Sequence, residues 1–468
     1  MAQTAIAWLR NDLRLADNPA LMRAAQHGRK VVALYVHETT SGTRPVGAAG
    51  RWWLHQSLTL LGADLAGRGI LLDVRAGETE EVLAQAVLEH HAEAVYWNRR
   101  YAPAACALDT EIKNKLRAQG IGADSLPGNV LAEPWTLATG QGRPYSVYTP
   151  FWKALKQKHI EVPAGLPNPH EPLHPPAVDQ SYRAPAWAEK FAGACAVGEA
   201  AAQAKLHGFL EHALGAYPLG RDFPEREGTS RLSAHLRFGE ISPRQIWHAA
   251  QAFSHAHPEQ AEAANKLLSE LAWRDFNYHQ LYYREDIAKV DMQTKYAGMQ
   301  WREAELEFKA WSRGQTGIPI VDAGMRELWA TGFMQNRVRM LTASFLTKNL
   351  LVDWRRGEQW FWDCLFDADE ANNPGNWQWI AGSGLDASPY FRIFNPVIQG
   401  EKFDAEGGYV RRWVPELTLL PDKWVHSPSE APPEVLSQAG IELGITYPHP
   451  VADLRSSRAR ALEAAHGL

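Results

Sequence analysis

The sequence predicts an N-terminal α/β domain of the parallel, Rossmann-like type, a long linker and a C-terminal all-helical domain. Strand-like and helix-like segments alternate through residues 1–128, seven prolines fall between Pro163 and Pro185, and the apolar pattern beyond about residue 200 is mostly helical. An alternation of strands and helices indicates a parallel sheet flanked by helices. We therefore expect domains over residues 1–128 and 201–468, with residues 129–200 as the linker.

The first domain is predicted from short apolar runs rich in β-forming residues, which we expect to be strands at Ala5–Leu9, Val31–Val36, Ile70–Val74 and Ala94–Trp97. The segments between them have a helical pattern, at Pro19–His27, Arg51–Gly67, Glu78–His90 and Ala104–Gln119. The first predicted strand runs into Arg10–Arg14 rather than into a glycine-rich loop. The dinucleotide-binding fingerprint is therefore missing, and a dinucleotide cofactor is expected elsewhere in the chain.

The linker is expected to be ordered in parts, because apolar residues persist through it. Beyond it, helical periodicity predicts helices at Glu199–Leu214, Pro243–Ala252, Asn265–Tyr278, Val321–Thr331 and Arg337–Leu351.

The composition is that of a soluble globular protein, with 45% hydrophobic and 22% charged residues in a chain of 468. No apolar run is long enough for a membrane span. Three distant cysteines exclude a disulfide framework and lack metal-type spacing, so we expect a cytoplasmic protein. We also expect a monomer. The net charge of −5 does not exclude nucleic-acid binding, because phosphate contacts need only a local basic face.

A first polar cluster combines Tyr217 with the run Gly228–Ser233. Backbone N–H groups, hydroxyls and the Arg231 guanidinium could donate to a phosphate. The alternative is a plain helix N-cap at Thr229 or Ser230, which the spacing does not exclude.

A second cluster is Glu270–Asp275, in which Glu270, Trp273 and Arg274 share one helical face. Together they could hydrogen-bond a base, stack on it and hold a phosphate. The alternative is a half-buried helix carrying a Glu270–Arg274 ion pair.

Two further clusters lie nearer the C-terminus. Asn336 and Met340 are four residues apart and would face the same side of a helix, with Arg337 and Arg339 pointing elsewhere; core methionine and surface arginine is the structural alternative. The run Asp367–Trp379 crowds carboxylates, amides and two tryptophans around a Pro-Gly turn. It is too polar for a core and too aromatic for an ordinary loop, which favours a functional role; an Asp-x-Asp pair without further ligands does not predict a metal site.

Taken together, the sequence resembles the photolyase/cryptochrome family over nearly its whole length. The matching segments are Trp8–Leu15 with Asp17–Pro19, Gly228–Ser233, Glu270–Asp275, Gly317–Ala323 and Pro389–Pro396. The resemblance implies the fold order derived above, with FAD, reduced in the active form, in the helical domain.

Position by position, the resemblance implies a flavin site and an electron relay. The residues similar to those that bind FAD are Tyr217, Thr229, Ser230, Arg231, Leu232, Ser233, Arg339, Asp367, Asp369 and Asn373, the last against flavin N5. Trp301, Trp354 and Trp377 match a three-tryptophan chain that passes electrons from the surface to the flavin. The chain has 19 tryptophans in all, and most of those outside this chain of three are expected to fill the core.

The resemblance further implies repair of cyclobutane pyrimidine dimers. Five residues match the dimer pocket: Glu270, Trp273, Asn336, Met340 and Trp379. The (6-4) photolyases carry histidines at the positions of Asn336 and Met340, and single-strand-preferring members have Gln at the position of Met340. We therefore expect a flipped-out dimer from UV-damaged duplex DNA, split by an electron from photoexcited reduced FAD. A cryptochrome-like photoreceptor is the alternative.

Contacts with the DNA backbone are expected from Arg221, Arg274, Arg337, Arg392, Gln399 and Lys402. One departure concerns an antenna chromophore. Members with the best-known folate antenna carry Asn-Glu in the first domain, whereas this chain has Asn98-Arg99. Methenyltetrahydrofolate, a deazaflavin or no antenna all remain open.

Overall fold

The computed structural model describes residues 3–175, 182–284, 286–390 and 392–466. These form two compact units. The first unit comprises residues 1–214, 230–285 and 366–371, and the second comprises residues 215–229, 286–365 and 372–468. Part of the predicted linker, residues 176–181, lies outside the described residues, as does Phe391.

The first unit contains a five-stranded parallel sheet with the strand order β3-β2-β1-β4-β5. Its strands are β1 (Thr4–Leu9), β2 (Lys30–Glu38), β3 (Leu71–Gly77), β4 (Ala92–Asn98) and β5 (Gly122–Leu126). The prediction of a parallel α/β domain followed by a helical region is confirmed. The fifth strand was not predicted, because Gly-Ala-Asp-Ser-Leu contains no β-branched residue.

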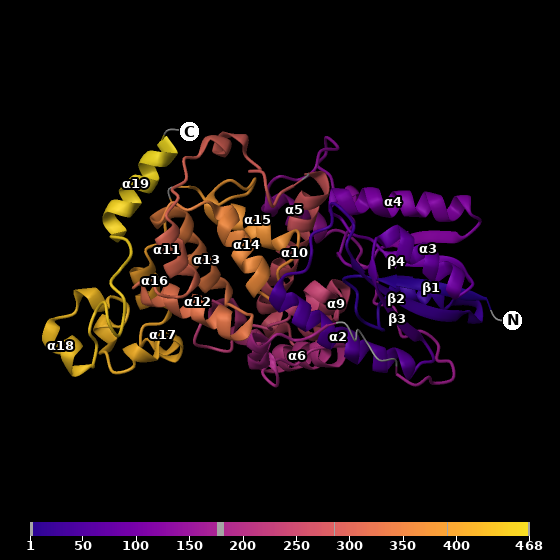
Figure 1. The fold of residues 1–468 in the computed structure, drawn as a ribbon, viewed down its shortest axis with the longest axis horizontal. Helices are drawn as coiled ribbons and strands as arrows, with labels where there is room; N and C mark the ends of the chain where they lie inside the picture. Colours follow the sequence, from indigo (N-terminus) through magenta and orange to yellow (C-terminus); the bar gives the residue numbers. More distant parts are fainter. Residues whose placement is uncertain (1–2, 176–181, 285, 391, 467–468) are drawn as a thin grey trace. The chain divides into compact units, whose positions relative to one another are not determined.

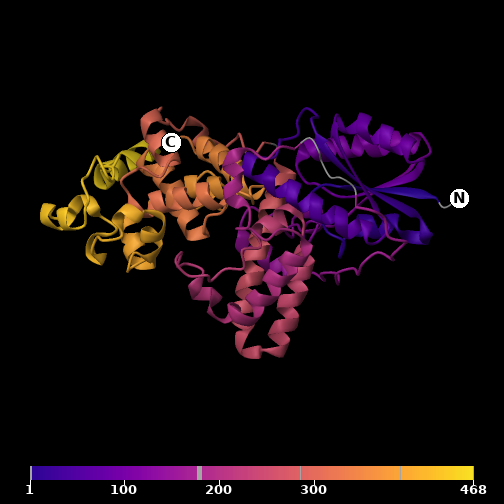
Figure 2. The same ribbon diagram turned by 60° about the horizontal axis from the view of Figure 1, so that its bottom comes forward.

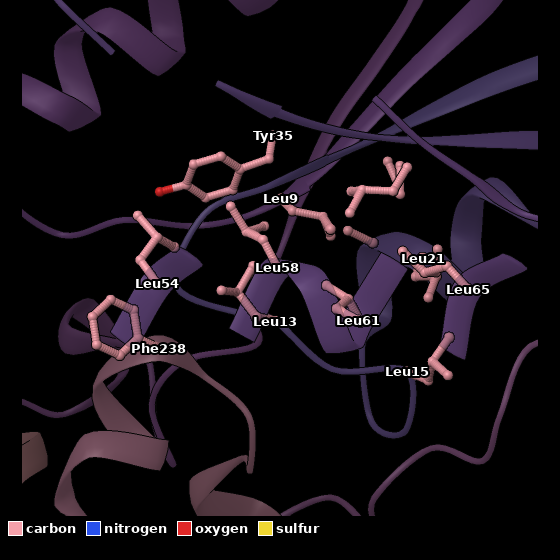
Figure 3. Packing of buried hydrophobic residues seen from close by; sticks show 14 of the residues in the cluster. Leu9, Leu13, Leu15, Leu21, Tyr35, Leu54, Leu58, Leu61, Leu65 and Phe238 are labelled. Carbon is pink, nitrogen blue, oxygen red and sulfur yellow. The ribbon is translucent and has the colours of Figure 1, made fainter. Parts of the chain in front are cut away.

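Both faces of the sheet are covered by helices, as alternation along β1 requires. Ala5, Ala7 and Leu9 belong to one buried cluster, which includes residues of the helix α2 (Ala48–Ala66). Ile6 and Trp8 belong to the other, together with residues of α3 (Thr79–Glu89) and α4 (Pro103–Ala118). Figure 1 shows α2 on one side of the sheet and α3 and α4 on the other. Figure 3 shows Leu54, Leu58, Leu61 and Leu65 spread along α2, in the same buried cluster as Leu9 and Leu21.

The remaining helices of the first unit are α1 (Pro19–Ala24), α5 (Tyr148–Leu155), α6 (Glu199–His212), α8 (Ser233–Phe238), α9 (Pro243–Ala256) and α10 (Ala261–Tyr283). The start of α9 follows from its sequence, because Ser242 and Gln245 form a reciprocal capping box in front of Pro243. The helices α9 and α10 lie side by side, as the pink helices of Figure 2. Helix α5 lies inside the predicted linker and was not predicted.

The segment after β1 that marks the family resemblance is a buried polar network. The Arg14 guanidinium donates to the carbonyl oxygens of Asp17, Gly128 and Gly239, at 2.8–3.1 Å. Asp17, which is fully buried, in turn accepts from Arg244 at 2.8 and 3.1 Å. Because Arg14 binds the carbonyl of Gly239, which ends α8, and Asp17 binds Arg244 of α9, these two residues join the segment after β1 to α8 and α9.

The second unit is built from helices. They are α7 (Tyr217–Gly220), α11 (Glu305–Ser312), α12 (Pro319–Thr331), α13 (Asn336–Ser344), α14 (Trp354–Cys364), α15 (Asn372–Ala381), α16 (Pro396–Phe403), α17 (Gly408–Trp413), α18 (Pro433–Gln438) and α19 (Leu454–His466). The single helix predicted over Arg337–Leu351 was wrong in its second half. There the chain changes to π-helical winding at Phe345–Asn349, and Leu351 has a positive φ of 55°. In the described part of the chain, no helix combines the length and the apolar character that crossing a membrane requires.

Candidate functional site

The first predicted phosphate-binding residues come together in the second unit through a close contact between two glycines. A Cβ on Gly228 would lie 2.9 Å from the carbonyl carbon and oxygen of Gly220, so only glycine fits there. Gly220 ends α7, which begins at the buried Tyr217, and Gly228 immediately precedes Thr229. The chain is thus folded back so that the segments carrying Tyr217 and Thr229 lie against each other.

The other half of the predicted phosphate loop belongs to the first unit. Residues 230–232 lead into α8, and Arg231 has a positive φ of 49°, a left-handed conformation that is costly for a side chain other than glycine. Arg237 of α8 donates to the carbonyl oxygen of Ala368 at 2.7 Å. This hydrogen bond joins α8 to Ala368, which lies between the predicted flavin ligands Asp367 and Asp369.

The start of α13 groups several predicted pocket and DNA residues in the second unit. Gln335 caps the helix by accepting from the backbone N–H groups of Arg337 and Val338, and its amide donates to the Arg221 carbonyl. Arg337 pairs with Asp222 at 2.8 Å. These contacts place Arg221 and Arg337 beside the helix that carries the pocket candidates.

Asn336 and Met340 share one face of α13, as predicted, with 3.8 Å between the Asn336 amide nitrogen and the Met340 sulfur. Asn336 is exposed and Met340 is half-buried, so neither side chain is packed in the hydrophobic core. The Arg339 Nε donates to the Met334 carbonyl at 2.7 Å.

The helix α15 carries Asn373, Trp377 and Trp379. The side-chain amide nitrogen of Asn373 donates to both the backbone oxygen and Oε1 of the buried Glu358, at 2.9 and 2.7 Å. Both amide hydrogens are therefore used, and the Asn373 carbonyl oxygen is the atom left for a further partner. Sequence reasoning missed Glu358, which has no local pattern that distinguishes it from any other carboxylate on an amphipathic helix.

The three tryptophans of the predicted relay lie in the second unit and differ in burial. Trp377 is buried against α14, where a Cβ on Gly357 would lie 2.2 Å from its ring. Trp354 is fully buried, and its indole N–H donates to Asp291 at 2.8 Å. Trp301 is only partly buried and packs against a cluster that contains Tyr390. Of the three, Trp301 alone is partly exposed, and the relay stays a prediction.

The predicted pocket residues Glu270 and Trp273 lie on α10 in the first unit. Glu270 pairs with Lys266 at 2.8 Å, one turn earlier on the helix. The alternative of a Glu270–Arg274 pair was therefore wrong. Trp273 is half-buried and stacks on Tyr148 of the linker helix α5, with 3.7 Å between ring centroids and 9° between ring planes.

Arg274 is used inside the first unit. Its guanidinium donates to the Asn129 carbonyl at 2.7 Å, and its side chain is 11% exposed. The neighbouring Asp275 accepts from the backbone N–H groups of Leu131 and Ala132 at 2.6 and 3.3 Å. Together the two residues hold the start of the linker on α10. A DNA contact by Arg274 stays a prediction, now with an intramolecular role beside it.

Burial raises the pKa of Asp275 to about 7, more than the two backbone donors and Arg274 lower it. The unfolded chain releases this proton near pH 4, whereas the native protein holds it up to about pH 7. The native state therefore binds the extra proton between these values, and this group's contribution to stability falls as the pH rises through that window.

We expect Asp275→Asn, which cannot ionise, to remove this pH dependence. As the pH rises from about 4 to about 7, the wild type should lose a few kcal/mol of unfolding free energy relative to the variant. Above pH 7 the difference between the two proteins should stay constant. Denaturant unfolding of both proteins across this range measures the difference. Parallel curves would show that Asp275 does not titrate in this window.

The remaining DNA candidates lie in the second unit. Arg392 and Lys402 are exposed and Gln399 is half-buried. A basic segment of the linker was missed. Between residues 134 and 160 the chain has four basic and no acidic side chains, and all four are exposed: Arg143, Lys153, Lys156 and Lys158. The signal was available in the sequence as a local charge excess within a chain of net charge −5.

At the position where folate-binding members carry Glu, this chain has Arg99, which forms an ion pair. Arg99 pairs with Glu133 of the linker at 3.0 Å, and Tyr101 donates to the same carboxylate at 3.1 Å. The preceding Asn98 is buried and donates to Asp12 at 2.6 Å. Asn98 therefore has a structural role in the buried polar network formed by the segment that follows β1.

Comparison with known proteins decides the family. A family model described as DNA photolyase matches residues 5–172, and one described as the FAD binding domain of DNA photolyase matches residues 267–467. A deoxyribodipyrimidine photo-lyase of Agrobacterium fabrum is 46% identical over 98% of this chain and 97% of its own. The chain belongs to the DNA photolyase family. The predicted family, and with it the predicted type of enzyme, is confirmed.

The photolyase fold is confirmed by solved structures as well. A bacterial class III photolyase from Agrobacterium tumefaciens superposes with a TM-score of 0.94 at 45% identity, covering 100% of this chain and 98% of the other. Relatives named cryptochromes match as well: cryptochrome-1 of Arabidopsis thaliana is 36% identical over 98% of this chain and 70% of its own. Relatives named photo-lyase and relatives named cryptochrome thus both match nearly the whole chain.

The photolyase family implies FAD, and the donor set of this chain fits it. The loop at residues 228–233 supplies hydroxyls, backbone N–H groups and a guanidinium, the chemistry that a diphosphate requires. Asp367 and Asp369 supply acceptors for hydroxyl or ring N–H groups, and Asn373 supplies a carbonyl oxygen. Within the described residues, no cluster of three His, Cys, Asp or Glu side chains could hold a metal ion.

Proposed function

We propose that this protein splits cyclobutane pyrimidine dimers in UV-damaged duplex DNA in a light-dependent reaction. The observation that carries the proposal is that the chain has all five residues matched to the dimer pocket, each on a helix of its own unit and none of them fully buried. Trp273 and Glu270 lie on one face of α10, Asn336 and Met340 on one face of α13, and Trp379 is half-buried on α15. A protein that only senses light has no chemical need for this set.

Each of these residues would have a definite task. Trp273 and Trp379 stack on the extruded bases, at about 1–3 kcal/mol for each stacked base. Glu270 and Asn336 hydrogen-bond the pyrimidine edges, and Glu270 must turn away from Lys266 to do so. Met340 lines the pocket with a polarisable apolar surface. When bound, reduced FAD supplies the photoexcited electron that opens the cyclobutane ring.

Asn373 would orient the cofactor. Because Glu358 takes both of its amide hydrogens, the Asn373 carbonyl oxygen can act only as an acceptor. An acceptor suits the N5–H group of the reduced ring system, so Glu358 fixes the orientation of Asn373 that favours the reduced cofactor.

The relay of Trp301, Trp354 and Trp377 would restore the reduced state. We expect Trp354→Phe to slow the photoreduction of oxidised protein, since a benzene ring is much harder to oxidise than an indole. Repair by chemically reduced protein should be unchanged. Absorbance under blue light with an external reductant measures the first, and dimer loss the second. A repair defect in reduced protein would contradict the relay role.

The test of the proposed function is repair of a duplex oligonucleotide with one thymine dimer. Fully reduced, FAD-loaded protein should remove the dimer in blue light and leave it intact in the dark. An equivalent oligonucleotide with a (6-4) photoproduct should remain unrepaired. If neither lesion is repaired, the proposal is rejected in favour of a photoreceptor. The similarity to Arabidopsis cryptochrome-1 makes the photoreceptor the second candidate function.

An antenna chromophore and the cellular setting stay predictions. An archaeal photolyase from Sulfolobus tokodaii, 29% identical with a TM-score of 0.80, holds two FAD molecules, which are taken to imply a novel light-harvesting cofactor. For this chain the predictions of a folate, a deazaflavin or no second chromophore all stand, and extraction of the purified protein followed by chromatography would decide between them. We also propose a cytoplasmic monomer, and sedimentation of the purified protein would measure its oligomeric state.

A further inference from the structure

We propose that Tyr148, in the linker helix α5, is a positioning residue that fixes the indole of Trp273 for stacking on damaged DNA. The inference rests on the proposed function, because Trp273 matters only if it stacks on a base. The linker would then be the rear wall of the dimer pocket and not only a connection between domains.

The contact between the two rings is close and nearly parallel. Their centroids are 3.7 Å apart and their planes differ by 9°. Aromatic pairs by themselves prefer offset or edge-to-face arrangements, so a near-parallel pair at this distance indicates that other contacts impose it. Because Tyr148 covers one face of the indole, a DNA base can stack only on the opposite face.

Tyr148 is fixed at its far end to the same helix whose tryptophan it covers. Its hydroxyl donates to the Ser269 carbonyl at 2.6 Å and lies 2.9 Å from the Ser269 hydroxyl. Ser269 precedes Trp273 by four residues, one turn of α10. Tyr148 therefore spans one helical turn, and its side chain is buried.

Two further contacts restrict the pair. Phe276 meets both rings edge-on, at 5.8 Å from Trp273 and 5.9 Å from Tyr148. The chain just before α5 is also held, because His279 accepts from the Tyr145 N–H at 3.0 Å and Gln280 donates to the Tyr145 carbonyl at 2.7 Å. The indole cannot change rotamer without breaking this packing.

A pre-positioned ring improves binding because it loses little freedom when the base arrives. Without Tyr148, the Trp273 side chain must be ordered at the moment of binding. Tyr148→Leu should therefore weaken binding of dimer-containing duplex about three- to tenfold. Binding of undamaged duplex, FAD content and the flavin spectrum should be unchanged. Tyr148→Phe, which keeps the ring and loses the hydroxyl, should restore most of the affinity.

The deciding experiment is a double-mutant cycle with Trp273→Ala, read as the dissociation constants of damaged and undamaged duplex. If Tyr148 acts through Trp273, Tyr148→Leu has no further effect in the Trp273→Ala background. Trp187→Leu, which removes another linker aromatic that contacts Phe191, is the matched control and should leave discrimination unchanged.

Two results would overturn the inference. One is an equal loss from Tyr148→Leu with and without Trp273, and the other is no loss in either background. Failure of the proposed function itself looks different, because the wild-type protein would then not distinguish damaged from undamaged duplex at all.

Discussion

Trp273→Ala is expected to weaken binding of a duplex with one thymine dimer about 5- to 150-fold, the equivalent of the 1–3 kcal/mol that one stacked base contributes. Trp273→Ala removes the whole indole, whereas Tyr148→Leu only lets the indole move. Trp273→Ala should therefore have the larger effect on binding. Affinity for undamaged duplex should hardly change, because an unflipped base does not reach the pocket.

The measurement is the dissociation constant for both duplexes, with FAD content recorded for each preparation. Trp329→Ala is the matched control, because Trp329 is 54% exposed on α12 in the second unit and has no predicted contact with substrate. An unchanged affinity of Trp273→Ala for damaged duplex would remove Trp273 from the pocket.

Gly239→Ala is expected to have the largest effect on stability. Gly239 ends α8 in the left-handed conformation, with φ of 69°. A Cβ there would lie 2.0 Å from the Asn11 carbonyl oxygen and 2.5 Å from the Asp12 Cα. The left-handed backbone and the overlap together should lower the unfolding free energy by about 2–5 kcal/mol.

Urea unfolding of the variant measures this loss. Gly208→Ala is the control, since Gly208 lies within α6 and a Cβ there meets nothing within 4 Å. It should raise the unfolding free energy by about 0.5–1 kcal/mol, as Ala favours a helix over Gly. Equal effects of the two substitutions would contradict the close approach of α8 to residues 11–12.

The sequence by itself determined the elements whose cause is local. Four strands of the sheet and most long helices follow from short-range apolar periodicity. This periodicity arises because each element must place apolar side chains on the face that it buries. Asn336 and Met340 share a face because they are four residues apart on a helix, and this too needs no tertiary information. The family resemblance supplied the roles of these residues, which periodicity does not contain.

The tertiary structure decided which partners the functional residues have. Glu270 pairs with Lys266 and not with Arg274, because Arg274 turns to the Asn129 carbonyl of the linker. Glu358 behind Asn373 and Tyr148 behind Trp273 come from segments that are 15 and 125 residues away in the chain. Such contacts depend on how helices pack, and local propensity carries no information about the packing partner. Tyr148 shows the consequence: its segment reads as linker in the sequence, and only the packing of α5 on α10 makes it a wall of the proposed pocket.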